Sequence, residues 1–289
     1  MPTLNIIGAG KLGRTLGRLW HQQGVFQIQS VCNRSAASSA AAVAFIGAGS
    51  TADTIATMAD ADCWLIASGD SQIADLAATL GARLAGRSDC VVFHCSGALS
   101  STELSPCRPA AVASAHPVHS FADPARSLQT FAGSSVAVEG DAAAISLIGD
   151  AFTALQCTLL NIAPENKTLY HAGSVIACNY LSALMDLSLR TFAAAGIERA
   201  QALQLLEPIV VQTAQNNMQL GPEQSLTGPI ARGDRATVAA QLRALGAVDM
   251  RVAEYYRQLG LACVELARRG DLPPADADAL EELLREPLR

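Results

Sequence analysis

The sequence predicts an α/β domain built on a doubly wound parallel sheet, followed by an all-α domain. Short apolar runs alternate with amphipathic stretches over the first half of the chain, and this alternation ends near residue 163. Beyond that point the periodicity is helical, and no strand pattern returns. Alternating strands and helices form parallel sheets, because the crossover helices cover both faces of the sheet. We therefore expect one domain at residues 1–162 and a second at residues 163–289.

The individual elements follow from the same patterns. Short apolar runs predict strands at residues 3–7, 26–32, 63–67, 91–94, 111–115 and 135–139. Helical spacing predicts helices at residues 11–23, 36–45, 71–84 and 141–155 of the first domain, and at 164–195, 200–220, 235–245 and 248–269 of the second. The helix from Pro164 is apolar nearly all round, so it must be buried in a bundle or against a partner subunit.

Composition narrows the classes of function. Half of the 289 residues are hydrophobic, 16% are charged, and the formal net charge is −6 with no basic run, which argues against a nucleic-acid partner. We find neither a signal-peptide pattern nor an unbroken stretch of about 18 apolar residues, so we expect a cytoplasmic protein without a membrane span. The eight cysteines form no C-x-x-C pair and have no histidine at metal spacing, which predicts reduced thiols and no metal site.

The strongest motif is Gly8-Ala9-Gly10-Lys11-Leu12-Gly13, which follows a predicted strand and opens a predicted helix. In this setting Gly8 permits a tight turn, Gly10 lets a pyrophosphate approach the backbone, and Gly13 lets the helix pack against the strand. The free N–H groups and the dipole at the start of the helix favour anions. The motif therefore predicts a Rossmann-type dinucleotide site made by all six residues, the alternative being a structural glycine-rich turn.

The second predicted strand ends in Asn33-Arg34-Ser35. An NAD enzyme places a carboxylate near this position to hold the ribose 2′-hydroxyl. Here a guanidinium and a hydroxyl are available to bind a 2′-phosphate, and no carboxylate would repel it. The segment predicts NADP (as NADPH) rather than NAD, unless Arg34 is simply a solvated loop arginine.

With these residues in place, the chain resembles candidate NADP oxidoreductases that join a Rossmann-like domain to a helical C-terminal domain of unknown function. They sit in a superfamily with 6-phosphogluconate dehydrogenase, ketopantoate reductase, pyrroline-5-carboxylate reductase and prephenate dehydrogenase. The resemblance covers nearly the whole chain and is carried by the segments IIGAGKLG, FHCSGALSS, SAHPVHSF, YHAGSVIACNYLSAL and LTGPIARGD. It implies the fold, the cofactor and a C-terminal domain like that of 6-phosphogluconate dehydrogenase, but no particular substrate.

Two segments at predicted strand ends carry candidate chemical groups. Ser96 and His116 resemble the Ser and His-Pro segments of prephenate dehydrogenases, in which serine and histidine hydrogen-bond the reacting hydroxyl of the substrate. The resemblance implies that Ser96 orients the substrate and that His116 acts as an acid or a base, because the pKa of histidine lies near neutral. Alternatively, His116 only ties two loops together by hydrogen bonds.

The helix expected from residue 164 carries further candidates. In ketopantoate reductases the corresponding helix has Lys, Asn and Asn at four-residue intervals, and the matching positions here are His171, Val175 and Asn179. The usual catalytic lysine is absent there, and it is also absent at Val175, near which 6-phosphogluconate-type enzymes would place it. His171 and Asn179 lie roughly on one helix face, so we expect both to line a cleft as catalytic residues. Alternatively, Asn179 caps a neighbouring loop.

The segment LTGPIARGD, residues 226–234, resembles in position the substrate-proximal loop of pyrroline-carboxylate reductases. Thr227 and Arg232 are the substrate-binding candidates, because the guanidinium fork of arginine matches two carboxylate oxygens. Alternatively, Arg232 pairs with Asp234 and only braces the loop.

These observations predict an NADP-dependent oxidoreductase that reduces a small carboxylate-bearing carbonyl or imine by hydride transfer. The nicotinamide is expected in an interdomain cleft past the glycine turn, Ser68 and Ser96, where His116 or His171 donates the proton. One alternative is a non-catalytic dinucleotide-binding sensor, and another is an NADP–deazaflavin oxidoreductase. The expected partners are a small-molecule substrate and a second copy of the chain, in a homodimer assembled through the helical half, with neither nucleic acid nor membrane.

Overall fold

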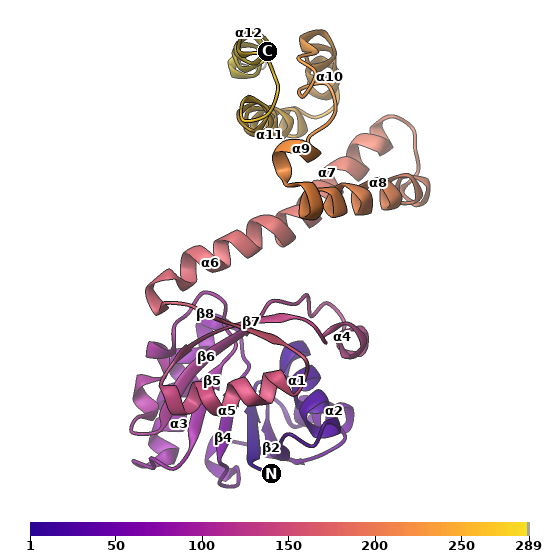
Figure 1. Cartoon of the computed structure of the whole chain (residues 1–289). Coiled ribbons are helices and arrows are strands. Elements are labelled where there is room, and N and C mark those ends of the chain that lie inside the picture. Colours follow the sequence, from indigo (N-terminus) through magenta and orange to yellow (C-terminus); the bar gives the residue numbers. More distant parts are fainter. Residues whose placement is uncertain (288–289) are drawn as a thin grey trace. The chain divides into compact units, whose positions relative to one another are not determined.

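The computed structural model describes residues 1–287 and separates into two compact units, which divide between Ala177 and Cys178 (Figure 1). The first unit runs from Met1 and contains every strand of the described chain, whereas the second unit is helical. The boundary expected from sequence, 162/163, marks the end of the last strand. The packing boundary falls later, because the first turns of the following helix pack with the first unit.

The first unit is built on one eight-stranded sheet, with strand order β3-β2-β1-β4-β5-β6-β7-β8. Every neighbouring pair is parallel except β6 and β7, which are antiparallel. Chain order reverses between β1 and β4, and in doubly wound sheets such a reversal opens a crevice at the carboxyl ends of the strands. The strands are β1 (Thr3–Ile7), β2 (Gln27–Cys32), β3 (Ser50–Thr51), β4 (Cys63–Ile66), β5 (Val91–His94), β6 (Ala111–Pro117), β7 (Ser135–Gly140) and β8 (Thr158–Asn161).

Helices cover both faces of this sheet, so each face has its own apolar core. Leu65 and Phe93 point into the cluster that holds Trp20, whereas Trp64 and Val92 point into the other. This alternation is what a strand with two buried faces requires. The helices are α1 (Lys11–Gln22), α2 (Ala36–Ile46), α3 (Asp70–Leu84), α4 (Pro124–Thr130), α5 (Ala142–Thr153) and α6 (Lys167–Ser174), with 3-10 turns η1 (Ile55–Thr57), η2 (Ser101–Cys107) and η3 (Pro164–Asn166).

The doubly wound α/β fold is confirmed, with corrections to the sheet. The sheet is not wholly parallel, because β7 runs against β6 with Ser114 opposite Glu139. The short strands β3 and β8 were not expected, since neither forms a distinct apolar run. All four residues of β8 are exposed in the first unit.

The second unit consists of helices around a small core. Its elements are η4 (Val175–Asn179), a π-helical turn that begins in the first unit, followed by α7 (Tyr180–Ala194), α8 (Arg199–Leu220), α9 (Pro222–Ser225), α10 (Arg235–Val248), α11 (Met250–Arg268) and α12 (Pro274–Arg285). The core joins Val238 of α10, Val264 of α11 and Leu280 of α12. In contrast, α8 buries only Ala202 and α7 only Leu189. The predicted all-α second half is confirmed, and α12 is an additional helix that the sequence pattern did not predict.

One stretch, Pro164–Ala194, is long and apolar enough to cross a membrane by length and composition alone. Polar and charged residues interrupt the apolar run, so the stretch is not the unbroken one that the sequence analysis looked for, although its mean hydropathy is high enough. One such stretch is weak evidence for a membrane span, and Lys167 near its start is buried inside the first unit.

Candidate active site

The glycine turn after β1 is held tightly between two other strand ends. Gly8 has φ +80°, and its N–H donates to the Cys32 carbonyl at the end of β2 (2.9 Å). The N–H of Ala9 donates to Oδ1 of Asn33 (2.6 Å). A Cβ on Gly8 would lie 2.9 Å from the backbone nitrogen of Ser68, which follows β4. Only glycine fits there, both in conformation and in space.

The start of α1 offers an open face to an anion. Gly10 is its N-cap and supplies no side-chain cap, so the first-turn N–H groups lack a side-chain acceptor. A Cβ on Gly10 would meet nothing nearer than 3.9 Å, whereas a Cβ on Gly13 would lie 2.9 Å from the Ala67 side chain. Lys11 is exposed beside this end of the helix, and Leu12 is half-buried. The turn therefore fits the pyrophosphate of a dinucleotide.

In the segment after β2, Asn33 is hydrogen-bonded within the protein, whereas Arg34 and Ser35 are exposed. Asn33 is committed inward, because its Nδ2 donates to the Ser38 carbonyl and hydroxyl, both at 3.0 Å, while its Oδ1 holds the glycine turn. Ser35 is the N-cap of α2 and accepts from the Ser38 N–H (3.2 Å). Arg34 is exposed and makes no hydrogen bond or ion pair with any described residue. The exposed guanidinium and a helix start without acidic residues suit a phosphate.

A cavity of about 260 Å³ lies beside the glycine turn, at the carboxyl ends of β4, β5 and β6. His116 of β6 and His171 of α6 both line it and meet edge to face, with ring centroids 5.5 Å apart. Nδ1 of His171 is buried without a hydrogen-bond partner. Leu12, Ser68 and Ser96 line the same cavity, together with Ala67, Asp70, Cys95, Gly97, Pro117, His119 and Phe121.

Ser96 is positioned as a hydrogen-bond donor. Its Oγ accepts from the N–H groups of Ala98 (3.2 Å) and Leu99 (3.0 Å), which engages both lone pairs. The hydroxyl proton is left to donate, and no described residue accepts it. The Ser96 side chain, which is 6% exposed, therefore offers one O–H to whatever occupies the cavity.

His116 is a neutral imidazole at neutral pH. Burial, and secondarily the positive charges possible at His171 and Lys167, lower the pKa of His116 to about 4. Its Nδ1 lies 3.0 Å from the hydroxyl of Tyr170. Burial raises the pKa of Tyr170, so the phenol keeps its proton and donates to Nδ1. On this assignment from partners, His116 carries its hydrogen on Nε2, which faces the cavity floor at Gly97.

Two other histidines have structural roles. His94, fully buried, accepts from the Ser96 N–H through Nδ1 (3.1 Å) and donates through Nε2 to the Ser100 carbonyl (3.0 Å). Burial lowers the pKa of His94 to about 4. His119 packs against Phe121 and Phe131. His94 thus shapes the loop that presents Ser96 without entering the cavity.

Lys167 was missed by the sequence analysis. Its ammonium donates to the Ser96 carbonyl (3.0 Å) and to the Ser114 hydroxyl, and it lies 3.9 Å from the Glu139 carboxylate. The signal that could have found it is the spacing Lys167-x-x-x-His171, which places both on one helix face. Tyr170 was missed as well, since a tyrosine on an apolar helix is typical of a residue that packs in the hydrophobic core.

The remaining candidates belong to the second unit. Asn179 ends η4 and is exposed within that unit, as are Thr227 and Arg232. Their roles stay predictions. The alternative in which Arg232 pairs with Asp234 is not observed, because the Asp234 carboxylate caps α10 by accepting from Thr237 N (3.0 Å) and Oγ1 (2.6 Å).

Metal and thiol chemistry have little support in the described part of the chain. Across residues 1–287, no cluster of three or more His, Cys, Asp or Glu side chains could hold a metal ion. Burial raises the pKa of Cys95, the cysteine that lines the cavity, to about 12. Its thiol therefore stays protonated and is a poor nucleophile.

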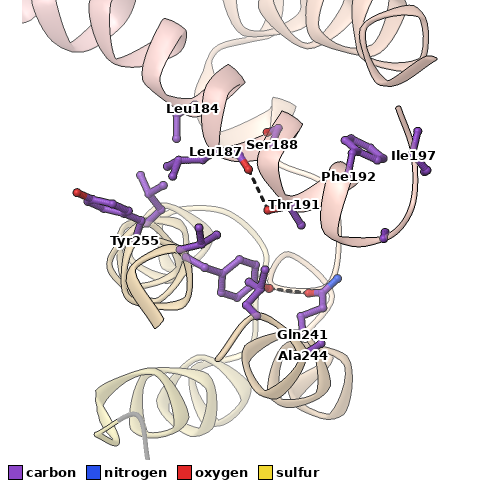
Figure 2. A pocket seen from close by; sticks show the side chains of 14 residues that line it. Leu184, Leu187, Ser188, Thr191, Phe192, Ile197, Gln241, Ala244 and Tyr255 are labelled. Carbon is purple, nitrogen blue, oxygen red and sulfur yellow. Dashed lines mark hydrogen bonds between the residues drawn. The ribbon is translucent and has the colours of Figure 1, made fainter. Parts of the chain in front are cut away.

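A larger pocket of about 500 Å³ lies within the second unit, between α7, α10 and α11 (Figure 2). Aliphatic and aromatic side chains dominate its lining, and Tyr256 donates to Gln241 there (2.5 Å). It contains no imidazole, carboxylate or cation, so we assign it no catalytic role.

Comparisons with known proteins agree with the two-part architecture. The family described as Rossmann-like domain matches residues 2–117, and the family described as Domain of unknown function (DUF2520) matches residues 134–263. No curated protein matches the chain.

Among solved structures, the chain is similar to a candidate NADP oxidoreductase from Bacteroides fragilis, with a TM-score of 0.77 and 19% identity over 93% of this chain and 98% of that one. A Thermotoga maritima protein gives a TM-score of 0.71 and 24% identity over 92% and 99%. The Plasmodium falciparum pyrroline carboxylate reductase with NADP bound gives 0.58 and 11% over 93% and 98%. At these identities the likeness shows a shared fold.

Proposed function

We propose that this chain, whose two parts match the Rossmann-like and DUF2520 families, is an NADP-dependent oxidoreductase that reduces a small carboxylate-bearing carbonyl or imine. The observation that carries the proposal is the cavity beside the glycine turn. A serine hydroxyl and two imidazoles converge there, at strand carboxyl ends where doubly wound folds bind ligands. The structural neighbours named as NADP oxidoreductase and pyrroline carboxylate reductase support the same class.

The residues that would hold the cofactor follow from the geometry of the first unit. The turn at Gly8 and Gly10 and the start of α1 would take the pyrophosphate, because their N–H groups are free. Arg34 and Ser35, at the start of α2, would take a ribose 2′-phosphate. Asn33 acts beneath them as a brace between the two segments. When bound, NADPH supplies the hydride.

The chain's own groups would polarise and protonate the substrate. The free O–H of Ser96 and the Nε2–H of His116 would donate to the carbonyl oxygen or imine nitrogen, which makes the carbon a better hydride acceptor. If His116 transfers its Nε2 proton, Tyr170 can return a proton to Nδ1 across the 3.0 Å contact. His171, whose Nδ1 has no other partner, is the second proton donor to be tested. Arg232 would clamp a substrate carboxylate, and Thr227 and Asn179 would assist.

The test is a turnover screen with the purified chain. Carboxylate-bearing carbonyls and cyclic imines are offered with NADPH, and loss of NADPH absorbance is followed. We expect substrate-dependent oxidation that His116→Gln or His171→Gln lowers by about 10² to 10⁴, with NADPH affinity kept. Binding of NADPH without turnover of any compound would support the sensor alternative. Oxidation only with a deazaflavin acceptor would support the electron-exchange alternative.

We also propose a homodimer formed through the helical half, in a cytoplasmic protein. Within the second unit, large apolar side chains stand exposed along α7 and α8, among them Leu184, Leu203, Leu205 and Ile209. Apolar faces of this extent on soluble proteins mark interaction surfaces. A second copy of the chain supplies a matching face, because an isologous contact pairs a surface with itself.

A further inference from the structure

A charged pair is sealed beneath the candidate cavity and is not explained by any step proposed above. Lys167 and Glu139 are 1% and 3% exposed, so both charges have left water almost completely. Burying an ammonium and a carboxylate costs more free energy than one contact returns unless further hydrogen bonds satisfy both groups. Burial of the pair therefore costs folding free energy, and its hydrogen bonds show which segments it connects.

Those hydrogen bonds all reach elements that shape the cavity. Lys167, on α6, donates to the carbonyl of Ser96 and to the hydroxyl of Ser114 on β6. Glu139, on β7, accepts from both the N–H and the hydroxyl of Ser101, each at 2.7 Å. The loop between Ser96 and Ser101 is thus gripped at both ends by the two charged side chains.

The same pair also fixes the start of α6. Tyr170 and His171 follow Lys167 by three and four residues, so they project from the same face of the helix. Tyr170 contacts His116, and His171 meets the His116 ring edge to face. Any shift of Lys167 would therefore move both side chains relative to His116.

We propose that Lys167, paired with Glu139, is a positioning residue that holds the Ser96 loop and the first turns of α6 together. The proposal rests on the proposed function for its catalytic meaning. Its structural part stands on the contacts alone, and its electrostatic part is a smaller contribution of the Lys167 charge to the low pKa of His116, beside the larger effect of burial. Lys167 touches neither the cavity surface nor any group that would react.

The electrostatic part has a definite sign. A positive charge at Lys167 opposes protonation of His116 and so lowers its pKa, in addition to the larger effect of burial. Asp70, which also lines the cavity, acts in the opposite direction. The titratable groups that face His116 are Asp70 on α3 and Lys167, Tyr170 and His171 on α6.

The test compares Lys167→Met, Glu139→Gln and the double variant. Lys167→Met alone leaves a buried carboxylate without its cation and is expected to be strongly destabilised, so the double variant, which removes both charges, is the decisive one. Ring NMR titration of His116, assigned with His116→Gln, reports its pKa without any substrate. Glu165→Gln, at an exposed carboxylate two residues before Lys167, is the matched control for loss of charge.

In the double variant we expect the His116 titration midpoint to rise in part, because burial still holds the pKa below the ordinary histidine range, and turnover to fall by roughly ten- to a hundredfold as the groups lose alignment, with NADPH affinity retained. Glu165→Gln should change neither. A folded double variant with the parental His116 titration and parental turnover would overturn the proposal and leave the pair as core structure. If the parent shows no turnover, the proposed function fails, while the titration still decides the electrostatic part.

Discussion

We expect that Gly97→Ala, which adds a single carbon atom, disables the candidate site. Gly97 lies in the cavity floor between His116 and His171, and its φ is outside the left-handed region, so alanine adds no backbone strain. A Cβ there would lie 2.3 Å from Nδ1 of His171 and 2.9 Å from Nε2 of His116. Gly97→Ala therefore tests the two imidazoles without removing either.

The expected magnitude follows from these distances. Ordinary contacts begin near 3.4 Å, so the His171 ring must withdraw by about 1 Å and the His116 ring by about half as much. Misplacing a catalytic group by about 1 Å costs on the order of 10² in rate. Overpacking of a filled site costs about 1–3 kcal/mol of folding free energy, which a stable domain tolerates.

The assay measures kcat, KM and NADPH affinity for Gly97→Ala and for a control, Gly246→Ala. A Cβ on Gly246, in α10, would meet only the Met250 sulfur at 3.5 Å, an ordinary contact. We expect the control to keep full activity and to gain roughly 1 kcal/mol of helix stability. Gly97→Ala should lose turnover while its NADPH affinity stays near the parental value.

A double-mutant cycle separates the cause from a general disturbance. If the clash with His171 carries the effect, Gly97→Ala should cost much less in a His171→Ala background, because the ring is already gone. Equal losses in both backgrounds would assign the effect to the backbone instead. Parental turnover in Gly97→Ala would refute the placement of the two imidazoles in the reacting site.

Three further predictions concern the cofactor, the assembly and acid stability. The parent should bind NADPH more tightly than NADH and Arg34→Glu should invert this, as nucleotide fluorescence will show; equal affinities in the parent would remove the argument. Light scattering at micromolar concentration should give twice the 30.0 kDa chain mass, and a monomer would count against the α7–α8 interface. His94 has its pKa lowered to about 4 against about 6.5 unfolded, so its stabilisation is complete above pH 6.5 and is lost as the pH falls towards 4. Unfolding titrations should therefore show about 2 kcal/mol lost by pH 5 on account of His94, beside a like loss from His116, and His94→Gln should remove only the His94 share.

The residues that the sequence expected together, and that the structure places around one cavity, depend on short-range geometry. The turn at Gly8 needs only a strand, a tight turn and a helix in succession, and each leaves a local pattern. Ser96 and His116 were expected together because the carboxyl ends of neighbouring parallel strands share one edge. His171 joins them because the first turns of the long helix pack on the first unit.

The parts that were missed depend on tertiary contacts without a local signal. A lone charged residue such as Lys167 or Glu139 normally predicts a solvated surface. Neither segment carries a local pattern that indicates a buried partner of opposite charge. The direction of β7 was missed for a similar reason. The segment that joins it to β6 contains a helix, α4, and so resembles the crossover of a parallel pair.

The low pKa of His116 limits the reactions that the site could support more than the presence of a histidine does. A histidine whose pKa lies near 4 cannot serve as a strong acid at neutral pH, because its imidazolium is hardly populated. It can donate a hydrogen bond from Nε2 at every pH above that value, since Tyr170 holds Nδ1 as the acceptor. Such a site polarises an electrophile and passes a proton only as negative charge develops on the substrate. Reduction of a carbonyl or imine, as proposed above, would create that charge during hydride transfer, so the proposed reaction needs no preformed acid.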